Sequence, residues 1–148
     1  MPQSLAKVLI HLVFSTTNRA PMIHHAVRSD LHAYLAGILQ NLECPPLQIG
    51  GTADHVHALF SLTRTLPIAR VVEEMKKSSS KWMKRKEITR FAWQAGYGVF
   101  SVSSSQSDQV VKYIATQEEH HRIRTFQEEV RGLLDRNGVS FDERYLWD

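Results

Sequence analysis

Apolar residues in this chain form short strand-like runs and longer helix-like repeats, and the order of these segments limits the fold more than any other feature. Runs rich in β-branched and aromatic residues predict strands over residues 7–15, 47–51, 55–62 and 96–102. Apolar residues that recur every three or four positions predict helices over residues 25–41, from Pro67 to about Trp82, and after Ser105 or Ser107. The order is therefore β-α-β-β-α-β, followed by further helices.

Turn and capping signals fix where these segments end. Pro45 and Pro46 end the first helix, and Gly50-Gly51 marks a turn that joins the second and third strands in a hairpin. Pro67 suits the first position of the second helix. A last helix over residues 125–135 ends at Asn137-Gly138. The pattern predicts an α+β fold of the ferredoxin-like, split β-α-β type, with an antiparallel sheet, helices on one of its faces and an added C-terminal helix.

The size and composition indicate one globular domain over residues 1–148. Hydrophobic residues make up 43% of the chain, which is enough to fill a core. The apolar run Val8–Phe14 is too short to cross a bilayer and lacks the flanks of a signal peptide. Cys44 is the only cysteine, so an internal disulfide is excluded. These features predict a cytoplasmic protein.

Positive charge is concentrated in one part of the chain. The net charge of +3 permits nucleic-acid binding without requiring it. The candidate DNA contacts are Lys76, Lys77, Lys81, Lys84, Arg85 and Arg90. Cationic side chains beside aromatic residues are typical of proteins that bind single-stranded nucleic acid. The alternative role of these cations is a solvated helix face.

The sequence His55-Val56-His57 places two imidazoles on the same face of a strand, because side chains alternate between the two faces. Two adjacent histidines on a rigid element can hold a divalent cation. The same short pattern also occurs by chance in strands without a metal. Asp54, just before the pair, is suited either to orient an imidazole or to close the hairpin turn.

Tyr113 and Gln117 are spaced to lie one turn apart on the same face of a helix. A tyrosine hydroxyl can act as a covalent nucleophile, and an amide oxygen is a suitable ligand for Mg²⁺ or Mn²⁺. The alternative is a core tyrosine whose hydroxyl reaches the surface. His120 and His121, which follow, are predicted to be surface or turn residues, and the role of His11 in the first strand is open.

Four segments in order resemble one family. Residues 54–60 resemble the histidine–hydrophobic–histidine motif of the HUH endonuclease superfamily. Residues 91–103 and 111–121 resemble the signature and the nucleophile helix of one branch, the single-tyrosine transposases of the insertion sequence 200/605 group. Residues 141–147 are similar to the end of these proteins. The similarity extends over essentially the whole chain.

The resemblance implies an enzyme that cuts and rejoins single-stranded DNA and recognises hairpins near the ends of a mobile element. By similarity, Tyr113 attacks the scissile phosphate and forms a 5′-phosphotyrosine link. His55, His57 and Gln117 would hold Mg²⁺ or Mn²⁺. Members of this group are homodimers whose active sites are completed in trans, so the resemblance implies that Tyr113 serves the partner subunit's histidines.

Four alternatives differ from this hypothesis in ways that can be tested, and one of them is a decayed copy of a transposase that has lost its activity. Relaxases and rolling-circle initiators are other HUH nucleases, but relaxases are often larger, and initiators frequently carry two neighbouring tyrosines. A domesticated transposase relative would process repeated chromosomal palindromes. A non-catalytic module would bind single-stranded nucleic acid without needing a divalent cation.

Overall fold

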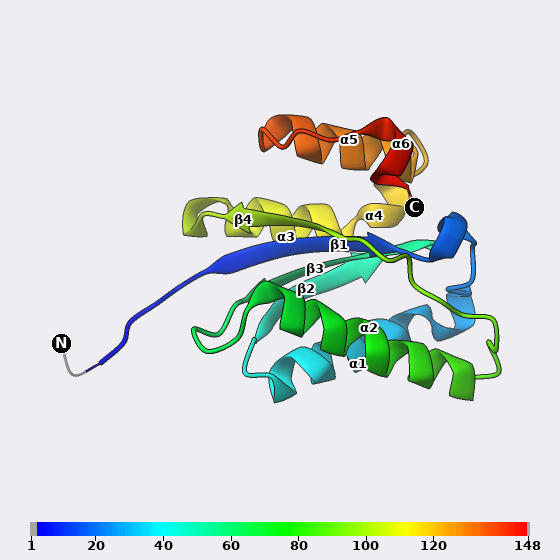
Figure 1. The fold of residues 1–148 in the computed structure, drawn as a ribbon, viewed down its shortest axis with the longest axis horizontal. Helices are drawn as coiled ribbons and strands as arrows, with labels where there is room; N and C mark the ends of the chain where they lie inside the picture. Colours follow the sequence, from blue (N-terminus) through cyan, green and yellow to red (C-terminus); the bar gives the residue numbers. More distant parts are fainter. Residues whose placement is uncertain (1–2, 148) are drawn as a thin grey trace.

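The computed structural model describes residues 3–147 and contains four strands, two 3₁₀ turns and six α-helices within that range (Figure 1). The strands are β1 (Leu9–Ser15), β2 (Pro46–Gly51), β3 (His55–Ser61) and β4 (Gly98–Val102). The 3₁₀ turns are η1 (Thr17–Arg19) and η2 (Ser104–Gln106). The helices are α1 (His25–Asn41), α2 (Ile68–Arg85), α3 (Ser107–Ala115), α4 (Gln117–His120), α5 (Phe126–Arg136) and α6 (Glu143–Leu146).

The strands form one antiparallel sheet in the order β2-β3-β1-β4. The β2–β3 pair is the predicted hairpin, and β1 lies between β3 and β4. This order and the β-α-β-β-α-β sequence confirm the predicted ferredoxin-like arrangement. In the register of the two inner strands, Val13 lies opposite His57 and Ser15 lies opposite His55.

The two faces of the sheet carry different side chains because successive residues alternate between them. Phe14, Val56 and Phe60 belong to the main core, in which α1 and α2 pack against one face. Val13 packs instead with residues of α5, and Leu59 packs with Ile114 of α3. Figure 1 shows α1 and α2 on one side of the sheet and the helices from α3 onward on the other. The prediction that helices cover a single face was therefore incomplete.

Three local predictions differ from the structure. Pro67 is the N-cap of α2, and the helix begins at Ile68. Neither predicted serine caps α3: its N-cap is Gln106, because η2 leads directly into the helix. The helix that carries Tyr113 ends at Ala115, because its C-cap, Thr116, has a φ of −111° and a ψ of 29° that interrupt the helix before α4 begins.

Gly37, in the middle of α1, should be replaceable by alanine with a gain in stability. A Cβ built on Gly37 meets no atom within 4 Å, and its φ lies outside the left-handed region. Alanine restricts the unfolded chain, so Gly37→Ala should raise the free energy of unfolding by about 0.5–1 kcal/mol. Urea denaturation followed by circular dichroism checks this, and a lowered midpoint would contradict it.

Candidate active site

The two histidines of β3 lie fully buried beneath the C-terminal helices. The side chains of His55 and His57 project from the same face of the strand, with ring centroids 5.2 Å apart, and neither residue is exposed to solvent. Val56, between them, points into the opposite core. The strand geometry thus brings the histidine pair together as the sequence predicted.

His55 is oriented by the turn that precedes it. Its Nδ1 lies 2.7 Å from Oδ1 of Asp54 and 3.0 Å from Oγ1 of Thr52. Burial by itself raises the pKa of Asp54, but the hydrogen bond with His55 lowers that pKa below its ordinary value, so this carboxylate is ionised. An ionised acceptor places the proton of His55 on Nδ1 and leaves Nε2 facing the site. Asp54 therefore has the orienting role.

His57 is held by His11 of β1. Nε2 of His11 lies 2.8 Å from Nδ1 of His57, and Nε2 of His57 lies 3.0 Å from Oε1 of Glu129. Burial lowers the pKa of His57 to about 4 and that of His11 to about 3, so both imidazoles are neutral at pH 7. With its proton on Nε2, a neutral His57 donates to Glu129 and accepts from His11 at Nδ1; with its proton on Nδ1, it donates to His11 and Nε2 is free to bind a cation. This assigns a role to His11 that the sequence left open.

Tyr113 lies on α3 beside the histidines of its own chain. Its ring centroid is 5.8 Å from that of His57, and its hydroxyl donates a hydrogen bond to Oε2 of Glu129. Burial and this hydrogen bond raise the pKa of Tyr113, so the resting hydroxyl is protonated. The structure places the predicted nucleophile at the histidine pair.

Gln117 reaches the same site although the helix breaks before it. Its Oε1 lies 3.0 Å from Nε2 of His55, and its Nε2 donates to Oε2 of Glu129 over 3.1 Å. The bond to Glu129 fixes which end of the amide faces His55. Gln117 is buried. The prediction that Gln117 joins Tyr113 on one continuous helix is wrong, but both side chains donate hydrogen bonds to the carboxylate of Glu129.

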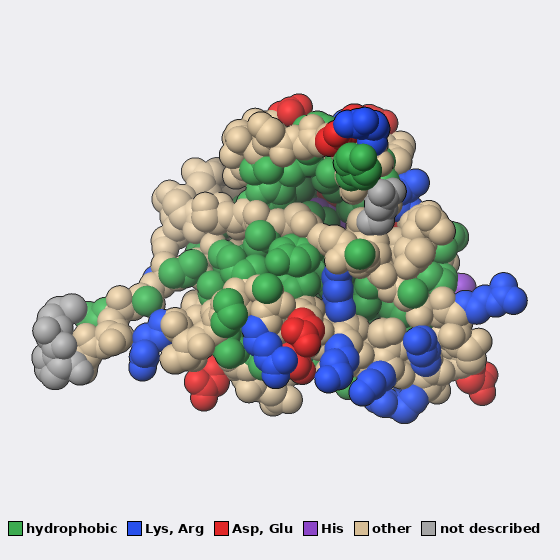
Figure 2. Space-filling model, viewed as in Figure 1, with side chains coloured by type: hydrophobic (Ala, Val, Ile, Leu, Met, Phe, Trp, Pro, Cys, Tyr) green, Lys and Arg blue, Asp and Glu red, His purple; other side chains and the backbone are tan. Residues whose placement is uncertain are grey.

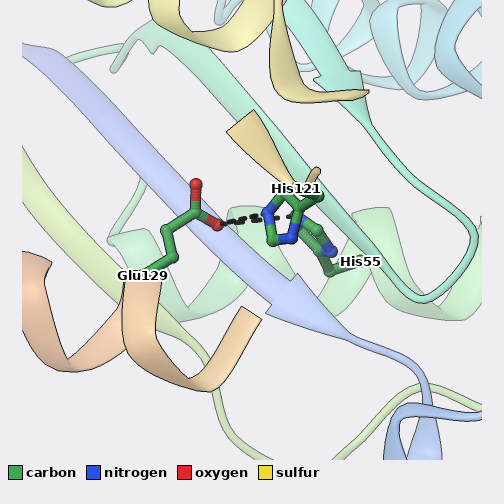
Figure 3. Close-up of side chains that lie close together, drawn as sticks. All are labelled: His55, His121 and Glu129. Atoms are coloured by element: carbon green, nitrogen blue, oxygen red, sulfur yellow. Dashed lines mark hydrogen bonds and ion pairs between the residues drawn. The ribbon is translucent and has the colours of Figure 1, made fainter. Parts of the chain in front are cut away.

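Two residues at the site were not predicted: His121, which follows α4, and Glu129 of α5. Nε2 of His121 lies 3.1 Å from Oε1 of Glu129. His121 was predicted to be a surface or turn residue; it does lie in a turn, but its side chain is only 14% exposed, so the surface role is corrected. Figure 3 shows Glu129 reaching from α5 toward His55 and His121. Within the described residues, ligand atoms of these three side chains lie within 4.8 Å of one another.

The donor set fits a divalent cation. In the tautomer of His55 that donates from Nδ1 to Asp54, the Nε2 lone pair faces the Oε1 lone pairs of Gln117 across 3.0 Å. Two acceptors this close need a proton or a cation between them. Imidazole nitrogen, amide oxygen and carboxylate oxygen are all ligands that Mn²⁺ accepts, and the oxygens suit Mg²⁺. The residues that could hold the ion are His55, His57, Gln117, His121 and Glu129.

Comparison with known proteins identifies the family. A sequence model of the IS200-like transposases matches residues 4–117, which is most of the chain. The chain belongs to the IS200-like transposase family. No curated protein matches this transposase with statistical significance.

Two solved structures share the fold of this IS200-like transposase. A candidate transposase from Deinococcus radiodurans is 24% identical with a TM-score of 0.61, and the match covers 77% of this chain and 93% of that one. A REP-associated tyrosine transposase bound to a REP hairpin is 15% identical with a TM-score of 0.62, and the match covers 95% of this chain and 90% of that one.

The basic residues of this transposase lie on the other side of the sheet from the histidines. Five of the six candidates are exposed on α2 or in the loop after it: Lys77, Lys81, Lys84, Arg85 and Arg90. Figure 2 shows lysine and arginine side chains gathered over that helix. Lys76 is half-buried and donates hydrogen bonds to the carbonyls of Gln94 (2.8 Å) and Gly96 (2.7 Å), so it anchors the loop before β4.

No helix among residues 3–147 is long and apolar enough to span a membrane.

Proposed function

We propose that this transposase cleaves and rejoins single-stranded DNA through a covalent bond between Tyr113 and a 5′-phosphate. The observation that carries the proposal is the meeting of the Tyr113 hydroxyl, His55, His57 and Gln117 in one buried cluster. A tyrosine beside a donor set for a divalent cation is the combination that phosphoryl transfer requires.

The tyrosine hydroxyl loses its proton and its oxygen attacks the scissile phosphorus, which forms the tyrosine–phosphate bond and breaks the bond to the 3′-oxygen. The released strand ends in a 3′-hydroxyl once its oxygen takes a proton. A 3′-hydroxyl of another strand then attacks the same phosphorus, which forms a new phosphodiester bond, breaks the tyrosine–phosphate bond and returns a proton to the oxygen of Tyr113. One phosphodiester is exchanged for another, so no nucleotide cofactor is needed. Mg²⁺ or Mn²⁺ held by His55, His57 and Gln117 would withdraw charge from the phosphate oxygens.

The protein residues supply positioning around this reaction. Asp54 and Thr52 fix the ring of His55, and His11 fixes the ring of His57. The pairing of β3 with β1 and β2 holds both histidines on a rigid strand. Such preorganised groups stabilise a transition state because they need little rearrangement when the reaction occurs.

Recognition of a hairpin is part of the proposal. It is supported by the similarity to the transposase bound to a REP hairpin, which extends over 95% of this chain. The exposed lysine and arginine side chains of α2 are the proposed contacts to the phosphate backbone of the DNA. The same similarity favours a second candidate, a domesticated enzyme that would process repeated palindromes with the same residues.

The test uses single-stranded oligonucleotides from the DNA that flanks the gene, incubated with the protein and Mn²⁺ or Mg²⁺. We expect a covalent adduct on denaturing gels that EDTA prevents and that peptide mass spectrometry locates at Tyr113. Absence of any adduct despite tight binding would support a non-catalytic module. Adducts on element ends favour the transposase, whereas adducts confined to dispersed palindromes favour the domesticated enzyme.

The family resemblance implied a homodimer with active sites completed in trans, but the structure brings Tyr113 to the histidines of its own chain. We therefore propose that Tyr113 acts in cis. A mixture of Tyr113→Phe and His57→Ala variants should then remain as inactive as each variant alone. Restored adduct formation would show that sites are completed between subunits. Wild-type protein diluted with each variant is the control for interference.

A further inference from the structure

Glu129 is a charged residue at a core position of an otherwise ordinary amphipathic helix. The apolar face of α5 consists of Phe126, Val130, Leu133 and Leu134, which pack with Val13 and Phe100 of the sheet. Glu129 lies on the same face, three residues after Phe126, and its side chain is 1% exposed. It also lies beyond residues 4–117, the part of the chain that matches the family.

The carboxylate of Glu129 lies among the groups assigned to the cation. Its Oε1 is 3.0 Å from Nε2 of His57, 3.1 Å from Nε2 of His121 and 3.5 Å from Nε2 of His55. Its Oε2 accepts hydrogen bonds from Tyr113 and Gln117. One oxygen therefore faces all three imidazoles, while the other holds the nucleophile.

The charge of Glu129 has little compensation in the described part of the chain. Its ion-pair partners there are histidines, and neither a lysine nor an arginine of residues 3–147 pairs with it. A carboxylate removed from water is destabilising unless a positive charge or a metal ion compensates it.

We propose that Glu129 is a ligand of the catalytic cation, so that α5 contributes to the metal site together with His55 and His57. This inference rests on the proposed function. A carboxylate oxygen is the ligand type that Mg²⁺ and Mn²⁺ favour most, and the set of imidazole and amide groups lacks an anionic member without it. A cation at this site would balance the charge that the helix buries.

An alternative role for Glu129 predicts the opposite effect on metal affinity. If Glu129 only occupied the position of the cation, it would compete with the ion, and removing its charge would strengthen metal binding. Mn²⁺ affinity of the full-length chain, measured by calorimetry without DNA, therefore decides between the two roles. The matched variants are Glu129→Gln and Glu128→Gln, because Glu128 is the exposed neighbour on the same helix.

We expect Glu129→Gln to weaken Mn²⁺ binding by about tenfold or more and Glu128→Gln to leave it unchanged. Unchanged or tighter binding by Glu129→Gln would overturn the proposal, as would absence of Mn²⁺ binding by the wild-type protein. A second measurement needs no variant. Mn²⁺ should slow the exchange of amide hydrogens in α5 of the wild-type chain if Glu129 binds the ion, and should accelerate it if the ion displaces Glu129.

Comparison with the adduct assay separates the two hypotheses. If adducts form but the Mn²⁺ affinity does not depend on Glu129, the proposed function is supported and the assignment of Glu129 as a metal ligand is wrong. If the Mn²⁺ affinity depends on Glu129 but no strand gives an adduct, Glu129 is supported as a metal ligand and the proposed reaction is wrong.

Discussion

Replacing Tyr113 with phenylalanine should reduce formation of the DNA–protein adduct by at least about 10⁴-fold, because the substitution removes the oxygen that forms the covalent bond. The substitution should impair the cleavage reaction and leave the fold nearly unchanged. The ring of Tyr113 still packs beside His57 in the variant, and only the hydrogen bond to Glu129 is lost. The free energy of unfolding should fall by no more than about 1–2 kcal/mol. Single-turnover assays on denaturing gels and thermal melts measure the two quantities.

Tyr97→Phe is the matched control for Tyr113→Phe. Tyr97 is 41% exposed and lies near Lys76, with which it makes a cation–π contact. It contacts none of the site histidines, so its substitution should leave the adduct rate unchanged. Adducts that persist in Tyr113→Phe would point to another nucleophile. Loss of the adduct in Tyr97→Phe alone would move the active site away from the histidine pair.

Much of the fold could be predicted from the sequence because local patterns determine it. The helix α1 spans His25–Asn41, the predicted range, since its apolar repeat ends at a pair of prolines. The Gly50-Gly51 turn and the alternation in β3 were enough to predict the hairpin and the shared direction of His55 and His57. The strand period of two residues leaves no other arrangement for that pair.

The rest of the site depends on tertiary contacts that no local pattern specifies. His121 was predicted to be a surface or turn residue rather than a ligand, because nothing near it in sequence shows that α5 will cover it. Glu129 did leave a signal, since it interrupts the apolar face of α5 with a charge. That signal identifies a buried carboxylate but not its partners, which come from β3 and from the segment around α4. The break at Thr116 likewise has no local signal, since residues 107–120 otherwise read as one helix.

The position of the basic residues is another feature that the sequence predicts only in part. A run of cations in sequence predicts an exposed basic face, and five of the six candidates are exposed. The sequence does not say on which side of the sheet that face lies. In the structure α2 and the C-terminal helices cover opposite faces, so DNA bound along α2 must pass around an edge of the sheet to reach Tyr113 (Figure 1).

The docking of α3 on the edge strand β2 depends on Gly50, which pairs with His57 across the hairpin. A Cβ placed on Gly50 would lie 2.2 Å from the backbone oxygen of Ile114 and 3.0 Å from Cγ2 of the same residue. A backbone oxygen in a helix cannot rotate away as a side chain can. Gly50→Ala must therefore push α3 off β2, and Ile114 directly follows the nucleophile in the chain.

We expect Gly50→Ala to slow adduct formation by about 10²-fold or more, because a displacement of about 1 Å at a reacting group has an effect of this size. Overpacking should also lower the free energy of unfolding by about 1–3 kcal/mol. Gly96→Ala is the control, since a Cβ there meets nothing within 4 Å. Near wild-type adduct rates in a folded Gly50→Ala variant would mean that α3 works away from β2, and Tyr113 would then have to reach its phosphate from another position, such as a partner subunit.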